Sequence, residues 1–148
     1  MDSLNQLLKL LNLKNEESVL DLGCGAGVIS EYISDQTGVQ VTGIDYAAPA
    51  IAEATERTSD KKFRLSFIHS DFCNMDLEPN SYDAVIAIDA LYWDDALEKT
   101  LPMLAVSLRP GGRMGIFLNH HINAGESSEL LNAEHSKLSK ELSSLGLA

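Results

Sequence analysis

Basic residues are scarce in this sequence, and their scarcity excludes one class of partner. The 148 residues include 11 lysines and arginines against 22 acidic residues, which gives a net charge of -11. Such a charge repels the phosphate backbone of nucleic acids and disfavours anionic membrane surfaces. The one close basic cluster, Lys61, Lys62 and Arg64, is typical of a solvated loop and is assigned no function. We therefore expect no nucleic-acid partner and no membrane partner.

Cysteines and long apolar runs are also few. Cys24 and Cys73 lie too far apart for a CxxC pair, and polar residues interrupt the N-terminal leucines, unlike the apolar run of a secretory leader. No apolar run approaches the roughly 18 residues that span a bilayer. These features favour a protein of the reducing cytoplasm.

The overall composition is that of an ordinary globular domain. Hydrophobic residues make up 45% of the chain and charged residues 22%, with only 4 prolines and 10 glycines. A chain of this length and composition is expected to fold as one domain, residues 1–148, around a single core.

Strand-like and helix-like segments alternate along the chain. Leucines at positions 4, 7, 8 and 11 repeat at helical spacing and predict an amphipathic N-terminal helix. Short apolar runs predict strands at residues 18–22, 39–44, 65–69, 82–88 and 113–118, and the other periodic segments predict helices at 28–38, 49–57, 95–108 and 126–145. This alternation indicates an α/β fold, with a parallel sheet covered by helices on both faces.

The candidate chemistry lies where the predicted strands end, because ligands bind at the carboxyl edge of such sheets. Gly23, Gly25 and Gly27 follow the first strand, and glycine lets the backbone approach a ligand closely. A tight strand-to-helix turn that binds no ligand would show the same three glycines. The neighbouring residues must therefore indicate whether a ligand binds here. Asp21 precedes the glycines, where an acid suits a cationic group better than a pyrophosphate. Asp45 lies roughly 20 residues further on, where a carboxylate can accept both hydroxyls of a ribose.

Five stretches, taken in order, carry a family resemblance. They lie at residues 19–27, 43–45, 69–72, 82–85 and 108–112. Together they resemble the motifs of class I S-adenosylmethionine-dependent methyltransferases, from the glycine-rich first motif to the turn before the fifth strand. The resemblance covers roughly residues 17–120. It implies a Rossmann-like, doubly wound sheet of order 3-2-1-4-5 and S-adenosylmethionine as the cofactor.

The resemblance also implies a role for each site residue. Asp21 and the glycine turn would hold the methionine portion, and Asp45 the ribose hydroxyls. Tyr46 would pack on the adenine, Asp71 would accept from its amino group, and the backbone N–H of Phe72 would face a ring nitrogen. The predicted cofactor-binding set is Asp21, Gly23, Gly25, Gly27, Asp45, Tyr46, Asp71, Phe72, Ile88 and, as a small space-filling residue, Cys24.

The predicted reaction is methyl transfer to a small-molecule acceptor by in-line displacement, in which positioning the nucleophile is the main task of the protein. For an alcohol or a protonated amine, the candidate bases are Asp89, Tyr92, His120 and His121. Tyr92 and Trp93 would either line the acceptor pocket or anchor a helix in the core. No metal site is expected at the two histidines, because neighbouring side chains on a strand point to opposite sides.

The sequence departs from the family after its fifth predicted strand. The family sheet closes with a sixth and a seventh strand, whereas this sequence stops at Ala148 within a region that reads as a helix. We expect a C-terminally incomplete domain whose fifth strand is an exposed edge. Such an edge invites pairing with another chain, and a dimer is the corresponding hypothesis.

Two alternatives to a complete methyltransferase stay open. One is a cofactor-binding module that is inactive alone, or that needs a partner chain or a further C-terminal segment. The other is a nicotinamide-dependent oxidoreductase, which is disfavoured because its fingerprint places glycine where Val28 stands and leaves Asp21 without a role.

Overall fold

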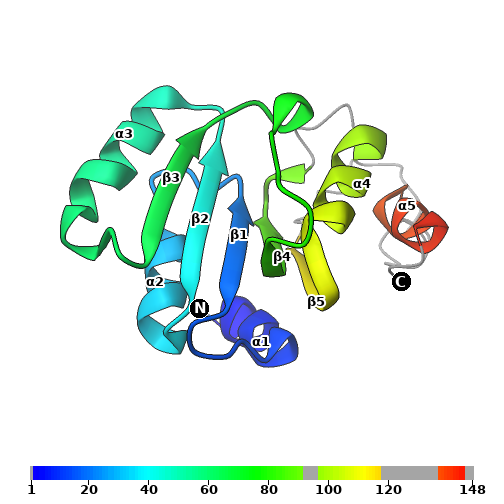
Figure 1. Ribbon diagram of the computed structural model, residues 1–148, viewed down its shortest axis with the longest axis horizontal. Coiled ribbons are helices and arrows are strands. Elements are labelled where there is room, and N and C mark those ends of the chain that lie inside the picture. The colour runs from blue at the N-terminus through cyan, green and yellow to red at the C-terminus, as the bar shows by residue number, and fades with distance from the viewer. Residues whose placement is uncertain (1, 92–96, 118–136, 146–148) are drawn as a thin grey trace, which may run out of the picture.

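The computed structural model describes residues 2–91, 97–117 and 137–145 (Figure 1). Its elements in chain order are α1 (Asp2–Leu11), β1 (Ser18–Leu22), α2 (Val28–Thr37), β2 (Gln40–Asp45), α3 (Ala48–Arg57), η1 (Ser59–Lys61), β3 (Leu65–His69), η2 (Phe72–Asn74), β4 (Tyr82–Ile88), α4 (Leu97–Ser107), β5 (Leu108–Phe117) and α5 (Lys137–Ser144). The two η elements are short 3₁₀ helices. Within these ranges, no helix is both long and apolar enough to cross a bilayer.

A parallel sheet with the order β3-β2-β1-β4-β5 forms the centre of the protein (Figure 1). The predicted fold class and strand order are confirmed. Strands β1 and β4 are central because their side chains are apolar on both faces, and Val19, Leu20, Val85 and Ile86 are completely buried. The chain runs outward from β1 to β3 and then returns to β4, so the strand order reverses beside β1. This reversal is where open α/β sheets bind ligands.

Apolar clusters cover both faces of the sheet. Leu20 of β1 belongs to one cluster, together with Leu101 of α4. Val19, its neighbour, belongs to the other cluster, together with Leu11 of α1 and Ile33 of α2. Successive side chains of a strand point to opposite faces, so β1 is anchored on both sides. The glycine turn that follows β1 therefore begins from a fixed point.

β5 begins earlier than predicted. The sequence predicted a turn at residues 109–112 and a strand from Arg113, whereas β5 starts at Leu108. Tyr82 pairs with Leu108 and Ala84 pairs with Arg113, so the intervening residues of β5 form an irregularity inside the strand. The proline and glycines of this stretch mark that irregularity and not the start of the strand.

Two further boundaries bear on the site. β2 ends at Asp45, which is the last residue of the strand, whereas the prediction placed it just after the strand. α5 spans Lys137–Ser144, and the earlier part of the predicted last helix, residues 126–136, lies outside the described residues.

Candidate cofactor-binding site

The glycine turn, residues 23–27, connects β1 to α2 beside the strand reversal. Gly23, Gly25 and Gly27 have φ angles of +76°, +52° and +72°, in the left-handed region that favours glycine. A Cβ at Gly23 would lie 2.3 Å from the Cβ of Ala90, and one at Gly27 would lie 2.6 Å from the Phe67 ring. A Cβ at Gly25 would meet nothing within 4 Å. The turn therefore packs tightly at both ends and is open in the middle.

This contrast predicts different results for two alanine substitutions. Gly27→Ala drives a methyl group into the Phe67 ring and is expected to lower the free energy of unfolding by about 3 kcal/mol. Gly25→Ala costs only the left-handed strain of about 1–2 kcal/mol, and its methyl group occupies the open side of the turn. Urea unfolding measures both costs. Equal destabilisation by the two substitutions would contradict the open middle of the turn.

Backbone hydrogen bonds tie the turn to the end of β2. The N–H groups of Gly23 and Cys24 both donate to the carbonyl oxygen of Ile44, at 2.8 and 3.1 Å. The N–H of Gly27 donates to the carbonyl oxygen of Cys24 at 2.9 Å. Both ends of the turn are thus satisfied by backbone partners. The N–H of Gly25, between them, has a side-chain partner.

Asp45 is that partner. Its Oδ2 accepts from the N–H of Gly25 at 2.8 Å, and its Oδ1 accepts from the N–H of Ala47 at 2.8 Å. The side chain is 7% exposed. Each carboxylate oxygen has two acceptor sites, so both oxygens retain capacity for a further donor. Asp45 therefore shapes the turn, a role that the sequence did not predict, and each of its oxygens can accept from one more donor.

Asp21 lies inside β1 and is only 3% exposed. Its Oδ2 accepts a hydrogen bond from the hydroxyl of Ser30, on α2, at 2.5 Å. Burial raises the pKa of Asp21 to about 6; the bond from Ser30 opposes this shift, and the negative charge of Asp45 adds to it. A buried carboxylate with a neutral partner gains from a nearby cation, so this position suits a positively charged ligand group.

Cys24 is buried in the turn and packs against β2. A Cβ added to Gly43 would lie 2.7 Å from its sulfur, which shows how closely the two residues approach. Burial, together with the charges of Asp21 and Asp45, raises the pKa of the thiol far above its usual range. A thiol that stays protonated is a poor nucleophile, so Cys24 acts by filling space.

The residues predicted to face the adenine lie at the ends of β2 and β3. Tyr46 is 70% exposed. Its carbonyl oxygen lies 2.9 Å from Nε2 of His69, a contact that joins the two strand ends. Asp71 is exposed and accepts from the N–H of Cys73 at 3.0 Å, which caps η2. Phe72 is buried at the start of η2.

The carboxyl end of β4 completes this edge of the sheet. Ile88 is its last residue and is half-buried. Asp89 follows with a φ of +51°, a left-handed conformation that is uncommon for a residue with a side chain. Its N–H donates to the carbonyl oxygen of Phe117 at 2.9 Å, which holds β4 to β5. Strained backbone of this kind often occurs at functional sites.

Several predicted residues lie outside the described ranges. They are Tyr92, Trp93, His120 and His121. In the ranges that are described, no group of His, Cys, Asp and Glu side chains is arranged to hold a metal ion.

The sequence reading missed three residues that shape the site. Ser30 is the partner of Asp21, and only the packing of α2 on β1 brings the two together. Phe67 fills the space below Gly27 from β3. Gly43 did carry a signal, because glycine inside a strand marks a close approach by another group. That group is the sulfur of Cys24.

Comparison with known proteins places the chain in a family. A family model described as a methyltransferase domain matches residues 19–112. A sterol 24-C-methyltransferase of Candida albicans is 34% identical over 111 residues, which cover 72% of this chain and 29% of that protein. The chain thus spans less than a third of the length of this relative.

Solved structures share the fold. The phosphoethanolamine N-methyltransferase 2 of Haemonchus contortus, in complex with S-adenosyl-L-methionine, is similar with a TM-score of 0.78 and 25% identity, over 96% of this chain and 32% of that chain. The [4+2]-cyclase SpnF is similar with a TM-score of 0.73 and 22% identity, over 78% of this chain and 43% of that chain. The second likeness shows the fold alone, since that protein is named for a different reaction.

Proposed function

Because this chain belongs to the methyltransferase domain family, we propose that it binds S-adenosylmethionine at the glycine turn and transfers the methyl group to a small-molecule acceptor. The geometry of the turn is the observation that supports this proposal. Its middle residue, Gly25, is open, and a buried acid, Asp21, precedes it with a neutral partner. The ligand has a cationic amino group, a ribose diol and an adenine, and it has no phosphate. A turn flanked by acids fits this set of groups.

The proposed contacts follow the order of the strands. Asp21 and the turn hold the methionine portion, with the charge of Asp21 facing the amino group. Asp45 accepts the ribose hydroxyls, which its free acceptor sites support. Tyr46 covers the adenine, and Asp71 accepts from its amino group. The backbone N–H of Phe72 and the side chain of Ile88 complete the adenine side, together with Gly23, Gly27 and Cys24, which shape the turn.

The residues of this chain contribute to the reaction by positioning. When bound, S-adenosylmethionine supplies a methyl group on a sulfonium, whose leaving group is already activated. The protein then needs to hold the acceptor in line with that bond. Asp89, at the carboxyl end of β4, is the proposed base for an acceptor that must lose a proton. Tyr92, His120 and His121 stay predictions for the same role.

The acceptor class is supported by the relatives. The sterol methyltransferase named above is a precedent for a small organic acceptor within this family. The net charge of -11 disfavours nucleic acid. We therefore propose a small molecule without assigning its identity.

A second candidate function is a cofactor-binding module that needs more protein for catalysis. One observation favours it: the chain spans only 29% of the Candida albicans relative. The glycine turn and its acids lie within the part that matches. Such a module would bind the cofactor but leave the acceptor site to another segment or chain.

Two measurements test these functions together. Isothermal titration calorimetry with S-adenosylhomocysteine should give saturable binding in the micromolar range. Incubation with S-adenosylmethionine and a panel of amines, alcohols, thiols and sterols should release S-adenosylhomocysteine with at least one acceptor. Binding without release on any acceptor would favour the module. Absence of binding would overturn both functions.

We also propose a reducing cytoplasm as the compartment and a dimer through β5. The sequence has only two cysteines, Cys24 and Cys73, and their wide separation along the chain supports the compartment. In the sheet that the described residues form, β5 lies at one edge, and a groove between it and α1 is lined by Leu7, Leu10, Met114 and Ile116 together with Arg113. Light scattering at high protein concentration should give the mass of a dimer, and a monomer there would contradict pairing through β5.

A further inference from the structure

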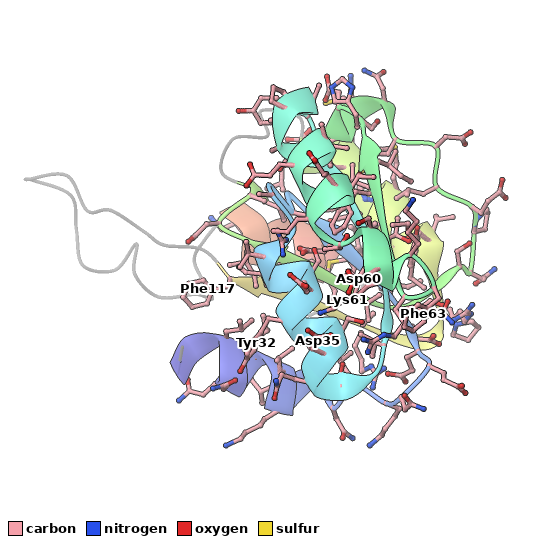
Figure 2. All side chains as sticks on the ribbon, turned by 90° about the vertical axis from the view of Figure 1, so that its left-hand side faces the viewer. Tyr32, Asp35, Asp60, Lys61, Phe63 and Phe117 are labelled. Carbon is pink, nitrogen blue, oxygen red and sulfur yellow. The ribbon has the colours of Figure 1, made fainter. Side chains whose placement is uncertain are left out.

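An ionic network joins the outer side of α2 to the segment around the end of α3. Glu31 and Asp35 of α2 pair with three basic residues, Arg57, Lys61 and Arg64. Figure 2 views this side of the molecule, where the labelled Asp35 and Lys61 lie against each other. Of the basic cluster predicted to be solvated, Lys61 and Arg64 are ion-paired at the surface and Lys62 is exposed.

Arg57 connects this network to the glycine turn. One end of its guanidinium group, Nη1, pairs with Oε2 of Glu31, and the other, Nη2, donates to the carbonyl oxygen of Ala26 at 2.8 Å. The N–H of Glu31 in turn donates to the carbonyl oxygen of Gly27 at 2.9 Å. Both partners of the ion pair thus contact consecutive carbonyl groups of the turn. The planar, fork-shaped guanidinium group is suited to hold two acceptors in a fixed relation.

The carbonyl group of Ala26 is a point at which a side chain from outside can hold the backbone of the turn in place. It belongs to the peptide between Ala26 and Gly27, and glycines stand on both sides of Ala26. The N–H of this peptide, that of Gly27, donates to Cys24 within the turn. Glycine adopts positive and negative φ about equally readily, so Arg57 at the carbonyl side of the peptide adds a fixed point from outside the turn. In the described part of the chain, two side chains from outside the turn hydrogen-bond to its backbone: Asp45 at Gly25 and Arg57 at Ala26.

We propose that Arg57, held by Glu31, is a positioning residue that fixes the glycine turn in the conformation that binds S-adenosylmethionine. This inference rests on the proposed function. Asp45 holds the turn and also faces the ligand, whereas Arg57 holds it from α3 and does not belong to the predicted ligand contacts. The affinity for the cofactor then depends on an ion pair outside the binding site.

The network also makes this affinity dependent on salt. Arg57 and Glu31 are partly exposed, so dissolved ions screen their attraction. Hydrogen bonds from Lys61 and then Arg57 hold the pKa of Glu31 below its usual range, which keeps the pair ionised near neutral pH. S-adenosylhomocysteine is zwitterionic with no net charge, so salt acts on the network more than on the attraction of the ligand.

The test compares Arg57→Ala with Lys61→Ala as the matched control. Both substitutions remove one positive charge from the network, but only the first removes the contact with Ala26. Calorimetry with S-adenosylhomocysteine should show about tenfold weaker binding for Arg57→Ala and a change within about twofold for Lys61→Ala. Arg57→Lys, which can make one of the two contacts at a time, should recover part of the loss. Raising the salt should weaken binding by the wild type more than binding by Arg57→Ala, because the buried Asp21 is screened less than the partly exposed ion pair.

Nuclear magnetic resonance of the free protein supplies a readout that general destabilisation would not move. The amide signals of Gly25 and Gly27 should shift in Arg57→Ala and stay in place in Lys61→Ala. If the wild type binds and Arg57→Ala binds equally well with unmoved glycine signals, Arg57 has no positioning role and the proposed function stands. If the wild type does not bind, the proposed function fails and this inference fails with it. Should Arg57→Ala not fold, Arg57→Lys takes its place in the same comparison.

Discussion

Asp45→Ala is expected to weaken the binding of S-adenosylhomocysteine about 100-fold, which corresponds to about 2.8 kcal/mol. Two losses combine in this variant. The ribose loses two acceptors, and hydrogen bonds to a charged group contribute about 1.5–3 kcal/mol each. The N–H of Gly25 also loses the partner that holds it at 2.8 Å, so the open middle of the turn is no longer fixed.

Calorimetry measures the affinity, and thermal unfolding checks that the variant is folded at the temperature of the titration. Asp60→Ala, an equal change of charge at an exposed position of η1, is the matched control and should bind like the wild type. Asp45→Asn keeps one acceptor oxygen and should lose about tenfold. Unchanged affinity in Asp45→Ala would show that the ribose does not bind at Asp45.

Asp21→Asn is expected to make the protein more stable at pH 7 and to weaken cofactor binding. Burial raises the pKa of Asp21 from 3.8 to about 6, so the folded state disfavours its ionised form. A shift of about two pKa units corresponds to roughly 3 kcal/mol that the charge costs at neutral pH. Asparagine occupies the same space and can still accept from Ser30, so we expect a gain of about 1–2 kcal/mol. Cofactor binding weakens because the variant lacks the negative charge that, in the proposed complex, faces the amino group of the ligand.

The pH dependence of stability follows from the sign of this shift. Between pH 3.8 and about 6 the folded protein binds a proton at Asp21 that the unfolded chain has released. The contribution of this residue to the free energy of unfolding therefore falls as the pH rises through that range. Below the range Asp21 is neutral in both states and the penalty disappears. Asp21→Asn lacks this slope, so the difference in stability between the two proteins should shrink as the pH falls through this range and level off below pH 3.8.

The pH dependence of binding has the opposite sign. The ionised form of Asp21 attracts the ligand amino group, so wild-type affinity for S-adenosylhomocysteine should rise about tenfold between one pH unit below the pKa and pH 7. Asp21→Asn should bind weakly at both values. Urea unfolding measures the stability, and calorimetry measures the affinity, at each of the two pH values. A variant that binds as tightly as the wild type at pH 7 would show that Asp21 does not face the cofactor.

The apolar runs predicted the strands, and the family resemblance implied their order, which the structure confirms. The apolar run of β4 is typical of a central strand, and β4 is buried on both faces. The start of β5 was not predictable in the same way, because the proline and glycines at 110–112 normally mark a turn. Pairing with β4 extends the strand through them, and this pairing is a tertiary effect.

Within the site, the sequence predicted residue types better than their contacts. The acids Asp21 and Asp45 were identified from their positions at strand ends, and both are buried there. The bond from Ser30 to Asp21 depends on the packing of a helix on a strand, which no local pattern encodes. The same holds for Arg57, which contacts Ala26 from a helix 31 positions further along the chain. Long-range contacts of this kind arise from topology and not from local sequence signals.

The two acids affect the stability of the turn in opposite directions. Burial makes the ionised form of Asp21 costly, and under the proposed function the same charge attracts the amino group of the ligand. Asp45 balances this cost by accepting two backbone N–H groups that would otherwise lack a protein partner. If the proposed contacts are right, substitutions at these two acids change stability and ligand binding together.

A crystal structure of this chain with S-adenosylhomocysteine tests the central claim most directly. We predict that the methionine portion lies over Gly25 with its amino group toward Asp21, and that both ribose hydroxyls donate to Asp45. A ligand bound elsewhere on the sheet, or with its ribose away from Asp45, would contradict the account.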